Sequence, residues 1–203
     1  MDSSYLDVMA EKYQQLCQYS RDYIENSSIT KFSSLKENYS DNITESDYNK
    51  KFKKDVTIIC ADKKPHQKPE IADLIAYDEN TLFLFCLKIA MGGPQCRDLY
   101  GQIETSSYLV KNNLKIDRNQ SLQNYHEELS NNNDEIMGWD EFKDLFKKDI
   151  CYIAGFIRDF NENDPSDYVK VLTYNINQKV RDNGHGFVLM DFNFNNNNYQ
   201  NYE

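Results

Sequence analysis

Hydrophobic residues along this chain follow two patterns, a helical spacing of three or four residues and short, nearly unbroken apolar runs. The first pattern predicts amphipathic helices, and the second predicts strands that are covered on both faces. Helices are expected over residues 4–25 (N-capped by Asp2, Ser3 or Ser4), 44–52, 96–112, 139–147 and 168–182. Strands are expected over residues 56–61, 70–77, 81–88, 149–157 and 186–192.

The order of these elements predicts an α/β fold. A hairpin of sequential strands is followed by strands that alternate with helices, which favours a mixed sheet with helices on both faces. We expect one domain over residues 1–192, with a polar surface insertion at about 113–137 that contains a short helix near 121–129. The Asn-rich segment 193–203 is expected to be a disordered tail.

Composition excludes several classes of protein. The chain has 203 residues and 39% of them are hydrophobic, which favours a packed globule over a disordered chain. It has no apolar run long enough to cross a membrane and no signal-peptide pattern at its start, so a cytoplasmic or host-cytosolic protein without a membrane partner is expected. The net charge of -10 argues against a strong, general nucleic-acid binder, although the lysines at 50–54 and 63–68 form a local basic stretch.

The cysteines predict buried thiols. Five cysteines are spread along the chain without a Cys-x-x-Cys pair, and the three histidines show no ligand spacing. A zinc site is therefore not expected, because zinc ligands in proteins come in closely spaced pairs.

An acid and a lysine are predicted to meet at one end of a hairpin. The apolar run 81–88 ends in Lys88, and Asp73 lies on the preceding strand, across a turn at Asp78–Asn80. We expect both side chains at one solvent-reachable rim of the sheet. They form either a catalytic site or a structural ion pair, and the sequence leaves both alternatives open.

The spacing of this pair resembles that of the PD-(D/E)XK nuclease superfamily. Asp73 is followed by Cys86-x-Lys88 and then by Gln102-x-x-x-Ser106, whose two polar side chains share one helix face. The resemblance implies a restriction-endonuclease-like αβββαβ core and a site that holds Mg²⁺ or Mn²⁺. The chain departs from the motif at Cys86, where the superfamily has an acid.

The chain is also similar to a sporadically distributed family of unknown function found on bacterial mobile and defence loci. Tyr48-Asn49, Glu70-Ile-Ala-Asp73-Leu74, Cys86-Leu-Lys88 and Gln102-x-x-x-Ser106 follow one another as in that family. The similarity spans about residues 45–192. It implies a fold more than an activity, and it adds Asn49 and Ser106 as supporting residues.

The nuclease hypothesis gives each candidate residue a role. Asp73 holds the cation, and Glu70, Glu45 or Glu11 replaces the carboxylate that Cys86 lacks, because Mg²⁺ prefers oxygen ligands to a thiol.

In the same hypothesis Lys88 orients the attacking water and stabilises the phosphate charge, and Gln102 positions a phosphate or Lys88. DNA and RNA are both candidate substrates. One alternative is a catalytically inactive, nuclease-like module of a toxin, effector or defence system that binds nucleic acid or a partner protein. Another is a hydrolase with Cys86 or Cys96 as nucleophile.

Overall fold

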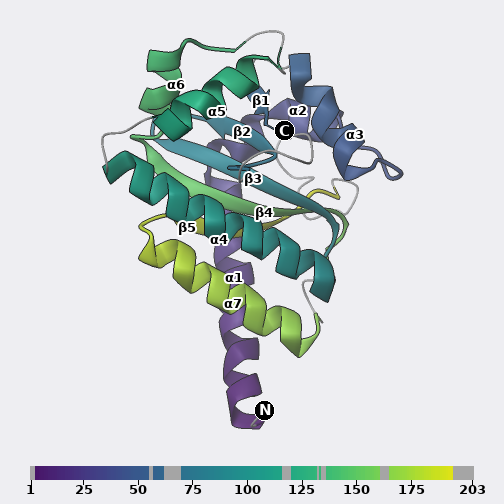
Figure 1. Cartoon of the computed structure of the whole chain (residues 1–203). Coiled ribbons are helices and arrows are strands. Elements are labelled where there is room, and N and C mark those ends of the chain that lie inside the picture. Colours follow the sequence, from purple (N-terminus) through teal and green to yellow (C-terminus); the bar gives the residue numbers. More distant parts are fainter. Residues whose placement is uncertain are drawn as a thin grey trace.

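A five-stranded mixed sheet forms the centre of the molecule (Figure 1). The computed structural model describes residues 3–54, 57–61, 70–115, 120–131, 133, 136–160 and 165–193. The strands are β1 (Ile58–Cys60), β2 (Leu74–Tyr77), β3 (Thr81–Ala90), β4 (Asp149–Asp159) and β5 (Gly186–Asp191), and they lie in sequence order across the sheet. β1, β2 and β3 pair antiparallel, whereas β3, β4 and β5 run parallel.

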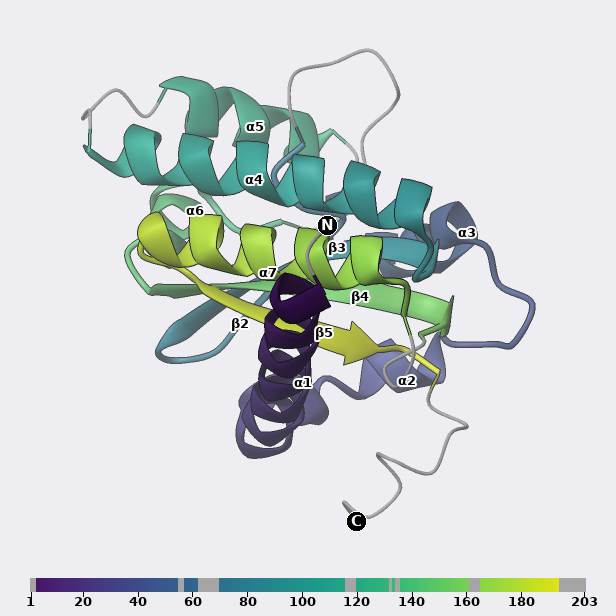
Figure 2. The ribbon, with the colours of Figure 1, turned by 90° about the horizontal axis from the view of Figure 1, so that it is seen from below.

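Helices cover both faces of this sheet. They are α1 (Ser3–Asn26), the 3₁₀ helix η1 (Ser28–Lys31), α2 (Ser33–Glu37), α3 (Glu45–Lys50), the 3₁₀ helix η2 (Lys51–Lys54), α4 (Gly93–Lys115), α5 (Gln120–Ser130), α6 (Trp139–Leu145) and α7 (Asp167–Asp182). α4 and α7 run side by side along one face, as both views show (Figure 2). The expected α/β class is therefore confirmed.

The side chains of β3 point alternately to the two faces of the sheet, so this one strand contributes to two hydrophobic cores. Leu82 and Leu84 pack with the α4, α5, α6 and α7 side, and Phe83 and Phe85 pack with the α2 and α3 side. Successive side chains of a strand point to opposite faces, so an unbroken apolar run is needed where both faces are covered. This arrangement leaves Lys88 as the first charged side chain of the strand, where β3 leaves the core.

Several boundaries differ from the sequence prediction. The strand expected over residues 70–77 begins only at Leu74, so Asp73 precedes β2 and does not lie on it. The expected loop at residues 89–95 is shorter, because β3 continues to Ala90 and α4 already begins at Gly93. Pro94 is compatible with the first turn of α4, where the backbone N–H that proline lacks has no helical partner. The expected stop of α7 at Asn183–Gly184 is confirmed, with Gly184 at a φ of +85°.

The apolar residues of this segment predict an inward-facing stripe on α4 at Leu99, Ile103, Tyr108, Leu109 and Val110, and this prediction is only partly correct. Leu99, Ile103 and Val110 are buried, but Tyr108 is 62% exposed and Leu109 is half-buried. Five expected positions cannot all face the core, because an α-helix buries a stripe of about 100°.

The short helix expected inside the polar insertion is present. α5 is the helix expected near 121–129, and its Leu122, Tyr125 and Leu129 are buried against the core. All five cysteines are buried, as expected, and none of them forms a disulfide. Within the described ranges, no helix is both long and apolar enough to span a membrane. The basic stretch at 63–68 and residues 194–203 of the expected tail lie outside the described residues.

Candidate active site

The β2–β3 hairpin places Asp73 and Lys88 at the same end of the sheet. Leu74 pairs with Phe85, so Asp73, one residue before β2, lies opposite Cys86 in the antiparallel register. The Leu87 N–H donates a hydrogen bond of 2.6 Å to Asp73 Oδ2. Asp73 is only 3% exposed, whereas the neighbouring Lys88 reaches the surface with 24% of its side chain exposed.

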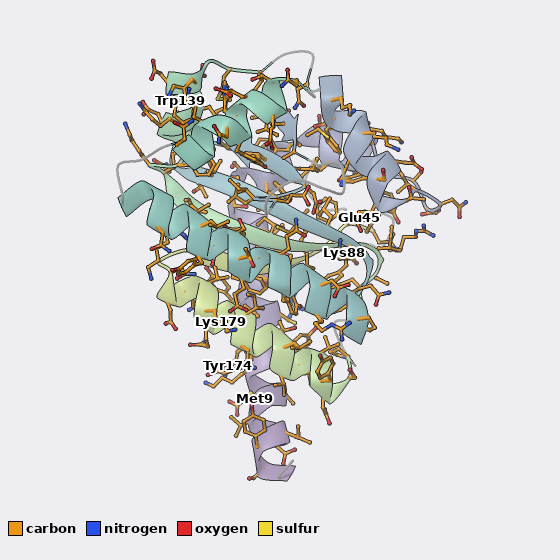
Figure 3. The ribbon with its side chains drawn as sticks, in the orientation of Figure 1. Met9, Glu45, Lys88, Trp139, Tyr174 and Lys179 are labelled. Carbon is orange, nitrogen blue, oxygen red and sulfur yellow. The ribbon has the colours of Figure 1, made fainter. Side chains whose placement is uncertain are left out.

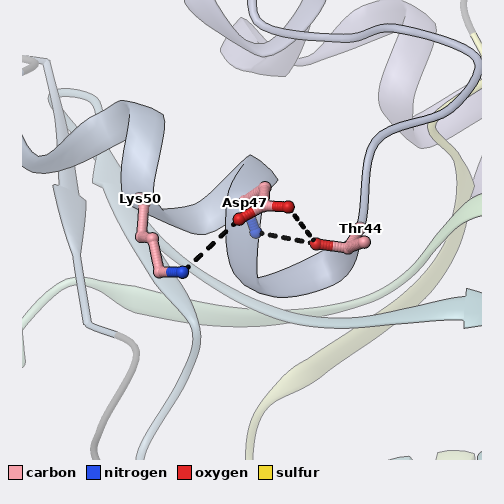
Figure 4. Close-up of polar contacts among 3 residues, drawn as sticks. All are labelled: Thr44, Asp47 and Lys50. Atoms are coloured by element: carbon pink, nitrogen blue, oxygen red, sulfur yellow. Dashed lines mark hydrogen bonds and ion pairs between the residues drawn. The ribbon is translucent and has the colours of Figure 1, made fainter.

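Glu45 reaches this rim from α3 and pairs with the lysine. Lys88 Nζ lies 2.9 Å from Glu45 Oε1, although 43 residues separate them in the chain (Figure 3). The Thr44 hydroxyl fixes the start of α3, because it accepts a hydrogen bond of 3.1 Å from Asp47 N and donates one of 2.7 Å to Asp47 Oδ2 (Figure 4). Glu45 is therefore held at the first position of a capped helix.

Glu70 and Gln102 complete the polar rim. Glu70 precedes β2, and Gln102 Nε2 on α4 donates a hydrogen bond of 3.2 Å to Glu70 Oε2. One turn further along α4, the buried Ser106 hydroxyl donates to the Ile71 carbonyl at 2.7 Å and lies 2.8 Å from the Tyr152 hydroxyl. Gln102 and Ser106 thus share one helix face, and both hold the Glu70–Ile71 segment against α4.

Burial and neighbouring acids act on the same carboxyl group. Burial, and next the charge of Glu70, raise the pKa of Asp73 well above its usual value, while the Leu87 N–H and Lys88 oppose the shift. Burial tends to lower the pKa of Lys88, but Glu45, Asp73 and Glu70 outweigh it and raise this pKa. When Glu45, Glu70 and Asp73 are all ionised, the single positive charge of Lys88 leaves two of their three negative charges uncompensated.

Cys86 lies inside the protein and keeps its proton. Burial, followed by the charges of Asp73 and Glu70, raises the pKa of its thiol well above the ordinary value. Burial also raises the pKa of Cys96 to about 11. Because the thiolate is both the nucleophile and the metal ligand, neither cysteine has the environment of a reactive one.

Asn49 is a buried amide without a hydrogen-bond partner. It is 0% exposed, and neither its Oδ1 nor its Nδ2 has a partner within the described ranges. It lies four residues after Glu45 on the same short helix, so the two side chains share a face. An amide buried in this way costs free energy that a ligand or an ordered water would recover.

One expected residue does not act on the acid–lysine pair, and one residue that was not expected lies at the same edge of the sheet. The exposed Glu11 on α1 accepts a hydrogen bond from Gln15 and is not among the charges that act on Asp73 or Lys88. Sequence reasoning missed Arg158, which follows the apolar run of β4 as Lys88 follows that of β3. The same signal, a cation that ends a buried strand, would have found it.

A hollow of 520 Å³ lies elsewhere, between α4 and the end of α7. It is lined by Glu104, Thr105, Tyr108, Lys179, Asp182 and Asn183. Lys179 is bonded to Glu104 at 2.6 Å across this hollow and lies apart from Glu45 and Lys88 (Figure 3). The hollow therefore does not belong to the acid–lysine rim.

Within the part of the chain that the structure describes, no three His, Cys, Asp or Glu side chains are arranged to hold one metal ion. Comparison of the chain with protein-family models, with curated proteins and with solved structures gives no match.

Proposed function

We propose that this chain is a divalent-metal-dependent nuclease with a degenerate PD-(D/E)XK site at Glu45, Glu70, Asp73 and Lys88. The observation that carries the proposal is the hairpin that brings a buried acid and a surface lysine to one rim, where two further carboxylates join them. The order α3, β1, β2, β3, α4, β4, with α5 and α6 inserted before β4, supports a restriction-endonuclease-like core, because it contains the αβββαβ order that the resemblance implies.

The donor groups at the rim fit a hard divalent cation. Mg²⁺ takes one or two protein carboxylates and completes its shell with water and substrate phosphates, so a cage of three acids is not required. Asp73 with Glu70 or Glu45 would hold the ion, which would neutralise the two uncompensated charges. The unpartnered Asn49 amide is a further oxygen donor on the Glu45 face. When bound, such an ion supplies Lewis-acid stabilisation of the phosphate and a more acidic water.

The protein groups then have separate tasks. Lys88 stays charged because three acids surround it, and an ammonium beside the reacting phosphate stabilises the negative charge that develops there. Gln102 positions Glu70 through its 3.2 Å hydrogen bond, and Ser106 holds the backbone between Glu70 and Asp73. Cys86 contributes packing in place of the expected acid.

The second candidate is an inactive module with the same fold that binds nucleic acid or a protein. The 2.9 Å ion pair between Lys88 and Glu45 supports it, since a lysine satisfied in this way is also what a structural site would show. Cation binding separates the two candidates.

The test is a Mn²⁺ titration by calorimetry together with cleavage of a fluorescent oligonucleotide. We expect Asp73→Asn to weaken Mn²⁺ binding at least tenfold, or about 1.4 kcal/mol. The fold should tolerate this change, because the folded protein already favours the neutral form of Asp73. Lys88→Met should keep the cation and lose cleavage by roughly 10²–10³-fold.

Cys86→Ser is the matched control and should bind Mn²⁺ as the unaltered protein does. Full cleavage by both the Asp73 and the Lys88 variants would overturn the proposal. An unaltered protein that binds no Mn²⁺ at millimolar concentration would instead identify the inactive module.

A further inference from the structure

We infer that Arg158 forms a second subsite at the same rim, which binds a nucleic-acid phosphate next to the one that faces Lys88. The inference rests on the proposed nuclease function and names the substrate contact on β4 that the acid–lysine motif does not include.

The sheet register places Arg158 beside Lys88. β3 and β4 are parallel, so their carboxyl ends share one edge, and Lys88 pairs with Phe156. Arg158 lies two residues beyond Phe156, and a register shift after Lys88 brings Asp159 opposite Ala90. Arg158 therefore lies beside the last residues of β3, and its Cα atom is on the order of 8 Å from that of Lys88. Two long cationic side chains at this separation can contact neighbouring phosphates of one strand.

The guanidinium is oriented, and among the described residues it has no anionic partner. Arg158 Nη2 donates a hydrogen bond of 2.8 Å to the Ile43 carbonyl, two residues before Glu45. Within the same described ranges its Nε is buried without a hydrogen-bond partner, and no carboxylate forms an ion pair with it. A half-buried cation without a counter-charge is costly to keep in a folded protein.

The described groups around Arg158 do not form an ion pair with it. Tyr39 lies near enough for the arginine to lower its pKa, although burial and Asp41 raise that pKa overall. On β5, burial raises the pKa of Asp191, and its Oδ1 accepts a hydrogen bond of 2.8 Å from Asn193 N. A planar guanidinium has five donors in a fork that matches phosphate oxygens, so a phosphate is the ligand that best satisfies it.

The experiment measures oligonucleotide binding without a divalent cation, so that no cleavage intervenes. Fluorescence anisotropy of a 5′-labelled oligonucleotide, single-stranded and duplex, is recorded in EDTA from about 50 to 200 mM salt. We expect Arg158→Gln to weaken binding about tenfold and to reduce the slope of log K against log salt by about one, since one phosphate contact is lost. Arg181→Gln, on α7 and stacked on Tyr19, should change neither quantity.

A second variant keeps the test decisive if Arg158→Gln loses its fold by circular dichroism. Arg158→Lys keeps the charge but not the fork, so it should weaken binding and leave the salt slope unchanged. An unchanged affinity and slope in both folded variants would overturn the Arg158 subsite, as would an unaltered protein that binds no oligonucleotide. Cation binding and cleavage, measured separately, report whether the nuclease proposal stands in each case.

Discussion

Burial and neighbouring charges set the protonation of single residues at the rim. Burial and the charge of Glu70 both raise the pKa of Asp73, so its carboxyl group favours the neutral form, whereas Glu45 raises the pKa of Lys88 against the effect of burial. The Asn49 side chain is buried on the helix that carries Glu45, and within the described ranges its amide has no hydrogen-bond partner. A protein keeps such groups at a cost in stability, and perturbed groups of this kind cluster at functional sites.

The Asn49 amide yields a prediction in which stability and function move in opposite directions. Asn49→Leu replaces an unsatisfied amide with an apolar side chain of similar shape. We expect the free energy of unfolding in EDTA to rise by about 1–3 kcal/mol, because the desolvation cost of the amide disappears. Mn²⁺ affinity, measured by calorimetry, should fall at the same time.

Asn49→Asp is the matched variant that keeps an oxygen donor, and it should retain the cation. A structural role for Asn49 gives the reverse result, in which Asn49→Leu unfolds at lower urea concentration and binds Mn²⁺ as before.

Short elements decide where the charged side chains lie. α3 has only six residues, so its position depends on its cap and on packing more than on helix propensity. Tyr48 packs its ring against Phe52 and Phe192, and its hydroxyl donates a hydrogen bond of 2.7 Å to the Leu35 carbonyl. These contacts fix α3 over the sheet and thereby bring Glu45 to Lys88.

The cap of α3 is therefore expected to support both the fold and the site. Thr44→Ala removes the hydroxyl that bonds to Asp47 N, and caps of this kind contribute about 1 kcal/mol. Urea unfolding should show a loss of that size, and Mn²⁺ affinity should fall because Glu45 is less well placed. Thr44→Ser keeps the hydroxyl and should retain both the stability and the Mn²⁺ affinity of the unaltered protein. Equal Mn²⁺ affinity in all three proteins would show that the Glu45 position does not matter for the cation.

The whole molecule is acidic, and its buried acids predict how stability changes with pH. Burial raises the pKa of Asp191 from 3.8 to about 6, against a hydrogen bond from Asn193 N. Because the folded-state pKa lies above the unfolded value, the folded protein binds the proton more tightly. The contribution to stability is full below about pH 4 and is lost as pH rises through 6.

Asp191→Asn should therefore flatten the fall in stability between about pH 4 and 6. The difference between 3.8 in the unfolded chain and about 6 in the folded protein corresponds to about 3 kcal/mol. The Asp191→Asn variant should therefore be more stable than the unaltered protein at pH 7 by up to that amount. Urea unfolding measured at pH 4, 5, 6 and 7 checks this. An unaltered pH profile in the variant would show that another group causes the fall.

The raised pKa of Asp73 acts in the same direction, because its ionisation destabilises the folded protein as pH rises. A bound cation reverses this effect, since it competes with the proton for the carboxylate. Stabilisation by Mn²⁺ should accordingly be larger at pH 8 than at pH 6 in the unaltered protein, and this difference should disappear in Asp73→Asn.

Local interactions explain what could be predicted from the sequence. The turn at Asp78 closes through hydrogen bonds from Asn80 N and Thr81 N to the Asp78 side chain, which sets the register of β2 and β3. Residues on two strands of one hairpin are fixed by that register alone. The meeting of Asp73 and Lys88 at one rim, the strands and most helix boundaries therefore follow from short-range patterns.

Long-range packing decided the rest. Among the candidate acids, Glu45 reaches Lys88 because α3 packs on the sheet, and Glu11 faces solvent on α1. Arg158 joins the edge because β4 returns parallel to β3 after a crossover of about sixty residues, whose register no local pattern encodes. The sequence by itself determined a hairpin with an acid and a lysine at one end. Only the tertiary structure brought Glu45 from α3 and Gln102 from α4 to this end of the sheet, because such non-local contacts depend on how whole faces of helices and strands fit together.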